Sequence, residues 1–155
     1  MVAWTPGPAG ALSPRPAGTK PSAIALMVCH AKARAEIDQL LGQRVQVSAT
    51  TWVNHRLSCS YQGTTGTMAL SVKELSSWPQ TIKYFRNLAH TMGKVAALPG
   101  LGQGAFVTSD GSVVARKDWK VLVVDTSRLS LPSSSTTNNV ALAVTAAIMD
   151  CWNGD

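Results

Sequence analysis

Short segments of alternating hydrophobic residues, joined by tight turns, constrain the fold of this 155-residue chain more than any other feature. In the segment 55–62, Leu57, Cys59 and Tyr61 occupy every second position. Such alternation places one side of a β-strand against a core. This criterion and its turn signals predict six strands, at 44–50, 55–62, 67–74, 105–108, 112–117 and 120–126. Because short turns join neighbouring strands, the sheet should be mostly antiparallel.

Three helices are predicted around these strands. Ser22 is a candidate N-cap for a helix over 23–41, and Gly42 is a candidate end. A second helix at 77–93 carries an apolar stripe at steps of three and four residues, and a third is expected at 139–152. The element order, α-βββ-α-βββ-α, predicts an α+β fold in which a mostly antiparallel sheet of about six strands packs with two or three helices.

The first 21 residues differ in composition from the rest of the chain. They contain five of the eight prolines, and such a segment buries little apolar surface. We therefore predict a disordered Pro/Gly-rich leader or linker over 1–21 and a single α+β domain over 22–155. No run of eighteen apolar residues is present, so no transmembrane segment is predicted.

The charge balance favours anionic partners. The net charge is +6, whereas charged residues make up only 14% of the chain. A basic protein attracts anionic lipid surfaces and polymers, but a scattered distribution of lysine and arginine argues against nucleic acid. The competing interpretation is a basic surface without a specific partner.

The three cysteines, Cys29, Cys59 and Cys151, permit three disulfide pairings. A bond between Cys29 and Cys59 would tie the first helix to the sheet, and closing that loop would contribute about 3–4 kcal/mol in the chain-entropy model. Cys151 would then be free, or it would be an alternative partner. Three reduced thiols in a cytosolic protein are the competing interpretation. The spacings match no zinc signature, so no metal site is predicted.

No arrangement of residues indicates catalysis. His30, His55 and His90 are dispersed, and no catalytic triad can be assigned from their spacing. The glycine-rich loop 98–104 follows a helix and enters a strand, the reverse of a dinucleotide-binding loop, so we expect a tight bend there. We predict no cofactor and favour a non-enzymatic protein. A small hydrolase or transferase whose residues converge only in the fold is an alternative.

Seven residues are candidate contacts to an anionic surface. Lys83, Arg86, His90 and Lys94 follow one another at steps of three and four, so they share one edge of the second helix. Trp119 lies in a turn between lysines, where it would be exposed unless its ring folds onto neighbouring residues. The full set is Lys83, Arg86, His90, Lys94, Lys117, Trp119 and Lys120.

Several short stretches resemble small secreted proteins and lipoproteins of actinobacteria. The stretches are Met27-Val28-Cys29, Leu57-Ser58-Cys59-Ser60-Tyr61, Leu70-Ser71-Val72-Lys73, Tyr84-Phe85, Leu98-Pro99-Gly100-Leu101-Gly102, Ala105-Phe106, Asp110-Gly111-Ser112-Val113-Val114, Lys117-Asp118, Lys120-Val121-Leu122 and Cys151-Trp152. The resemblance implies an extracytoplasmic, often lipid-anchored domain with a cystine early in the fold, and no assigned activity. Some related lipoproteins resemble a sheet-and-helix sandwich of the PsbP kind.

Two positions depart from this family pattern. Val28 is bulky where a lipid-attachment site before Cys29 needs a small residue, and Trp119 stands where the group usually has Asn or Gly. The resemblance and the candidate cystine predict a secreted or envelope-associated domain that binds a ligand or an envelope partner. The alternatives are a binder of anionic membrane or cell-wall polymer, the motif-free enzyme, and a cytoplasmic location.

Overall fold

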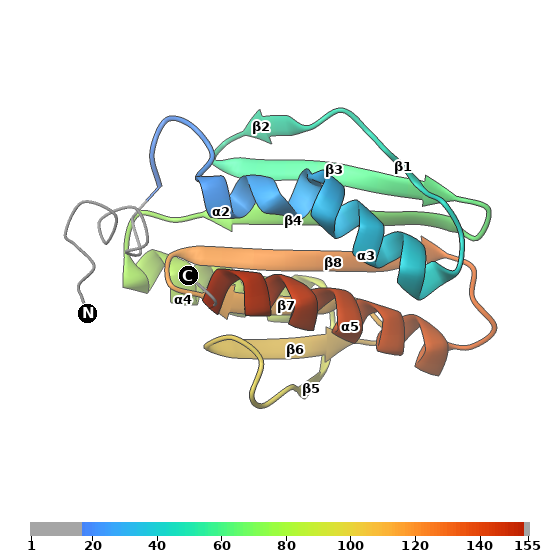
Figure 1. The fold of residues 1–155 in the computed structure, drawn as a ribbon. Helices are drawn as coiled ribbons and strands as arrows, with labels where there is room; N and C mark the ends of the chain where they lie inside the picture. Colours follow the sequence, from blue (N-terminus) through green and yellow to red (C-terminus); the bar gives the residue numbers. More distant parts are fainter. Residues whose placement is uncertain (1–16, 154–155) are drawn as a thin grey trace, which may run out of the picture.

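A computed structural model describes residues 17–153, in which one antiparallel sheet carries helices on both faces (Figure 1). The strands are β1 (Gln46–Val47), β2 (Thr51–Val53), β3 (Arg56–Gly63), β4 (Gly66–Glu74), β5 (Lys94–Ala97), β6 (Gly104–Thr108), β7 (Val113–Lys117) and β8 (Lys120–Leu129). The helices are α2 (Ala23–Leu26), the 3-10 helix η1 (Met27–Cys29), α3 (Ala31–Leu41), α4 (Trp78–Thr91) and α5 (Ser134–Asn153). The predicted α+β class is confirmed.

Both predicted groups of strands belong to the same sheet. The strand order is β1-β3-β4-β8-β7-β6-β5, with β2 paired to β3 beside β1. The long pairing of β4 with β8 joins the two groups, with Leu70 opposite Val124 and Val72 opposite Leu122. Every pairing is antiparallel, as the short turns predicted.

The two faces of the sheet contact different helices. Leu122 and Val124 of β8 point into the larger core, which α2, η1, α3 and α5 cover. Val121 points to the opposite face, where it packs with Phe106 and Val114 beneath α4. Alternating residues of one strand therefore supply both cores, because successive side chains point to opposite sides. Figure 1 shows α3 and α5 lying side by side across one face.

The predicted helix caps are confirmed, but the first helix is not continuous. The Ser22 side chain accepts a hydrogen bond from the Ala25 amide at 3.1 Å, and Gly42 ends α3 with a φ of 67°. The expectation of one helix over 23–41 is wrong, since His30 has an extended backbone (φ −99°, ψ 173°). The break follows Cys29, which is covalently held to the sheet.

Other boundaries also differ from the predictions. Strands β2 and β5 were not predicted, and the expected strand at 44–50 is reduced to β1, with Val47 exposed instead of inward. Helix α5 begins at Ser134, five residues before its predicted start at 139. Of the predicted leader, residues 1–16 lie outside the described residues. The Ala17 amide donates to the Leu75 carbonyl at 2.8 Å.

Candidate functional site

The cysteines occupy three different elements. Cys29 of η1 is bonded to Cys59 of β3, with their Cα atoms 6.0 Å apart, so the expected pairing is confirmed. Cys151 of α5 is free and half-buried. The disulfide joins the first helical segment to β3, the strand next to β1 and β2 at one edge of the sheet, and both of its residues belong to the larger core.

The candidate contacts on the second helix are exposed. Lys83, Arg86 and His90 follow one another at steps of three and four on the solvent side of α4, and all three are exposed. Lys94 is also exposed, but it belongs to the edge strand β5 and not to the helix. The exposed strip on the helix therefore consists of two cationic residues, Lys83 and Arg86, and His90.

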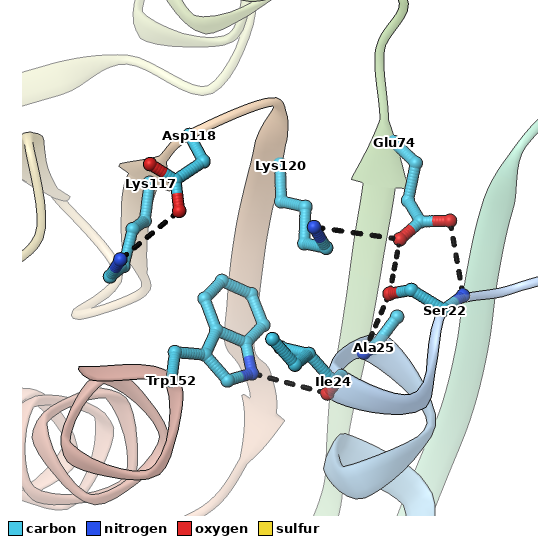
Figure 2. A network of polar contacts seen from close by, with 8 residues as sticks. All are labelled: Ser22, Ile24, Ala25, Glu74, Lys117, Asp118, Lys120 and Trp152. Carbon is cyan, nitrogen blue, oxygen red and sulfur yellow. Dashed lines mark hydrogen bonds and ion pairs between the residues drawn. The ribbon is translucent and has the colours of Figure 1, made fainter. Parts of the chain in front are cut away.

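The predicted role of Lys120 as a surface contact is wrong. Its side chain is buried, with 6% of its surface exposed, and its Nζ lies 3.9 Å from Glu74 Oε2 (Figure 2). Lys117 and Lys120 both point to the sheet face opposite α4, because they alternate with Arg116 and Val121. Lys117 Nζ is paired with Asp118 Oδ2 at 3.1 Å. Neither lysine joins the helical strip.

Glu74 and Lys120 belong to a polar network that fixes the N-terminal helix (Figure 2). The Ser22 hydroxyl donates to Glu74 Oε2 at 2.5 Å, and the Ser22 amide donates to Oε1 at 3.3 Å. Trp152 Nε1 donates to the Ile24 carbonyl at 3.2 Å, so the C-terminal end of α5 is bonded to α2. Burial lowers the pKa of Lys120, and attraction to Glu74 opposes this shift. Because both charges are buried and partnered, the network is structural.

Trp119 lies against other side chains instead of projecting into solvent. Its ring centroid lies 5.7 Å from that of Trp78, which is 40% exposed. The Arg116 guanidinium lies 5.7 Å from the Trp78 ring and donates to the Gln103 carbonyl at 2.7 Å. The Asp118 amide donates to Gln103 Oε1 at 2.8 Å, and the φ of 55° at Asp118 shapes the turn that contains Trp119. These contacts hold the indole within the fold.

A groove opens on the α4 side of the sheet, beside the helix. Its volume is about 520 Å³, and its floor comprises Ser58, Ser60, Ala69 and Ser71. These residues alternate with the core residues of β3 and β4, so they point to the α4 side. Since α4 packs on Phe106, Val114 and Val121 further along the sheet, it leaves these small side chains uncovered. The sheet-face groove is our candidate binding site.

The walls and ends of the sheet-face groove differ in chemistry. Tyr84, Leu88 and Met92, which follow one another at steps of four along α4 and its C-cap, form one wall. The segment between β1 and β2 forms the opposite wall with Ser48 and Ala49, and Thr51 follows at the start of β2. Charged side chains line the ends, with Arg56 at the start of β3 and Asp125 in β8.

Sequence analysis did not identify this groove. The alternation in β3 and β4 predicts the inward core residues, but it does not show what covers the outward residues. The sequence signal for the groove is a pair of small residues at successive outward positions of each strand. These are Ser58 and Ser60 in β3, and Ala69 and Ser71 in β4. Small residues on one sheet face leave room beside a helix, but only the fold shows that α4 stands next to them.

A second groove of about 400 Å³ lies between α3 and α5. Its lining is mostly apolar, from Ala33 and Ala35 on one helix and from Val144 and Ile148 on the other. Cys151 also lines it. This groove follows from the small residues where the two helices meet, and the charged residues Lys32, Glu36 and Asp150 also line it.

The three histidines, His30, His55 and His90, lie at exposed positions on different elements. His55 is exposed and packs edge-on against Trp52, with ring centroids 5.9 Å apart, and His90 is exposed on α4. Neither residue lines either groove. Within residues 17–153, no cluster of three or more His, Cys, Asp or Glu residues has the geometry to hold a metal ion.

Comparisons with protein-family models, curated proteins and solved structures find no match to this chain. Among the helices of residues 17–153, none combines the length and apolar character needed to cross a membrane.

Proposed function

We propose that this chain is a non-enzymatic, extracytoplasmic binding domain whose ligand site is the sheet-face groove. The observation that carries the proposal is the groove itself, about 520 Å³ in volume. Ligand sites in proteins are concave, have volumes of about 300–1,000 Å³, and combine apolar surface with a few polar groups. The apolar wall on α4 and the serine hydroxyls of the floor fit that description.

The disulfide supports a location outside the cytoplasm. Structural disulfides persist in oxidising compartments and are rare in reducing ones. The bond between Cys29 and Cys59 lies within the larger core. The resemblance to secreted proteins and lipoproteins of actinobacteria points to the same location.

Filling the groove tests the proposed function. Ala69 lies on the groove floor, so Ala69→Trp should occupy the site. A panel of cell-envelope fragments, short peptides, sugars and fatty acids would be screened by ligand-observed NMR against both proteins. We expect at least one compound to bind the native protein and to lose binding to Ala69→Trp. Ser109→Trp, in an exposed turn between β6 and β7, is the matched control and should retain binding.

The proposal is overturned if every compound that binds the native protein binds Ala69→Trp equally well. Circular dichroism melting curves would establish that both tryptophan variants are folded before the screen.

The second candidate function is attachment to an anionic surface through α4. The observation that favours it is the exposure of Lys83, Arg86 and His90 on one helix face. We expect Lys83→Glu with Arg86→Glu to weaken cosedimentation with phosphatidylglycerol vesicles at low salt. Lys32→Glu with Arg44→Glu changes the charge equally at exposed positions elsewhere and should have a smaller effect. Equal losses for both pairs would leave only a non-specific effect of net charge.

A further inference from the structure

We propose that the sheet-face groove takes a short linear peptide with free ends, its ammonium group at Asp125 and its carboxylate at Arg56. This inference rests on the proposed function, and it adds the chemical class of the ligand.

The charges of the groove stand at opposite ends of its floor. Arg56 pairs with Lys73 across β3 and β4, whereas Asp125 of β8 pairs with Ala69. Along β4, the row that contains Arg56 and Lys73 therefore lies four positions from the row that contains Ala69 and Asp125. Arg56 is exposed and Asp125 is half-buried, and both side chains line the groove. A ligand with opposite charges at its two ends complements this arrangement.

Neighbouring groups strengthen both ends. Lys73 Nζ donates to the Asn54 carbonyl at 2.5 Å and lies 5.7 Å from the Tyr84 ring centroid, so a second positive charge is held beside Arg56. Asp125 Oδ1 accepts from the Ser127 amide at 2.9 Å. A carboxylate accepts several hydrogen bonds, so the other oxygen of Asp125 remains available to an ammonium group.

The distance between the two ends sets the length of the ligand. Four residues along β4 and two steps between strands separate the backbones of Arg56 and Asp125 by about 17 Å. The side chains reach inward and shorten this span. An extended peptide covers about 3.3–3.6 Å per residue, so about four residues fit between the charged groups.

The middle of the groove suits a peptide chain. The hydroxyls of Ser58 and Ser71 can donate to and accept from backbone amides, while Leu88 and Met92 face the same space from α4. The inference therefore includes an apolar side chain at the centre of the peptide, directed to the α4 wall.

The tetrapeptide Ala-Leu-Leu-Ala with free termini is the probe. Titration of the isotope-labelled full chain, followed by NMR, should shift the backbone amide signals of Ser58 and Ser71. Acetylating the N-terminus or amidating the C-terminus should each weaken binding roughly threefold to fivefold, as expected for partly exposed ion pairs.

Two variants that each remove one charge assign the two ends. In Arg56→Gln, amidation should matter less than in the native protein, because only Lys73 remains to attract the carboxylate, while acetylation should weaken binding as before. In Asp125→Asn, which keeps the acceptor for the Ser127 amide, the pattern should be reversed. Lys83→Gln, on the outer side of α4, removes a charge outside the groove and should leave both capping effects intact.

The outcomes separate this inference from the proposed function. Equal affinity for free and capped peptides, or no shift at Ser58 and Ser71, overturns the zwitterionic peptide as the ligand. The proposed function is then decided by the Ala69→Trp screen alone, because that screen includes compounds without charged ends.

Discussion

Glu74 and Lys120 are the residues at which burial of charge is most costly. Their exposed fractions are 4% and 6%, and they lie 3.9 Å apart. Removing two charges from water is expensive, and their attraction offsets that cost only when hydrogen bonds satisfy the remaining atoms. Ser22 supplies two such bonds to Glu74. The pair is therefore more sensitive to losing one member than to losing both charges.

We expect Lys120→Met to destabilise the protein by about 3 kcal/mol, because it leaves the Glu74 carboxylate buried without a countercharge. Adding Glu74→Gln removes that charge and keeps an acceptor oxygen for one of the two Ser22 bonds, so the double variant should recover at least half of the loss. Urea denaturation of the three proteins measures both effects. If Lys120→Met left the free energy of unfolding unchanged, the pair would not be what holds the N-terminal helix to the sheet.

Tyr61 should make the free energy of unfolding depend on pH in the alkaline range. Its hydroxyl donates to the Val28 carbonyl at 2.6 Å, and burial raises its pKa from 10.0 to about 12, with Arg34 opposing the shift. The folded protein thus holds this proton more tightly than the unfolded chain does. The stabilisation is complete below pH 10 and is lost as pH rises through about 12.

The free energy of unfolding should therefore fall by about 2–3 kcal/mol between pH 10 and 12 because of this one group. In Tyr61→Phe, the protein should be less stable at neutral pH, but that part of the alkaline decline should disappear. Denaturation curves across this pH range provide the measurement. Parallel declines in both proteins would contradict the assignment to Tyr61.

At the scale of the element, glycine determines the path of the loop before β6. Gly102 has a φ of 60°, and a Cβ atom there would lie 2.6 Å from the Arg116 carbonyl oxygen. Gly100 has a φ of 78°, with no atom within 4 Å of such a Cβ. The expected tight bend is present. Both glycines adopt a positive φ, but only Gly102 is also required by close packing against the Arg116 carbonyl.

Gly102→Ala should therefore destabilise the protein by at least 2 kcal/mol more than Gly100→Ala, for which backbone strain alone gives roughly 1 kcal/mol. Thermal denaturation of both variants gives the comparison. Equal losses would mean that the loop moves away from Arg116 at little cost.

The sequence predicts elements well where local chemistry decides them. The caps at Ser22 and Gly42 and the alternation around Cys59 are local signals, and the corresponding elements are present. Tertiary contacts decide the rest. The helix break at His30 depends on the disulfide, and β5 exists because β6 offers it an edge, although Val95 is 64% exposed. The groove required knowledge of where α4 stands.

At the scale of the whole molecule, the disulfide connects the first helical segment to the sheet across thirty residues. Chain-entropy arguments give about 3–4 kcal/mol for such a loop. We expect Cys29→Ala with Cys59→Ala to lower the free energy of unfolding by that amount, as measured in urea. Cys151→Ser is the control and should change it little, because Cys151 is free. Thiol titration should find one reactive group in the native protein and three after reduction.

Alternate residues of the sheet line two different regions, the core and the groove. Along β3 and β4, Cys59 and Leu70 build the core, while their neighbours Ser60 and Ala69 floor the groove. A substitution at a floor position should change the lining of the proposed binding groove and leave the interior untouched. Under the proposed function, every second residue of these strands can therefore change the specificity of the groove while the core residues between them stay the same.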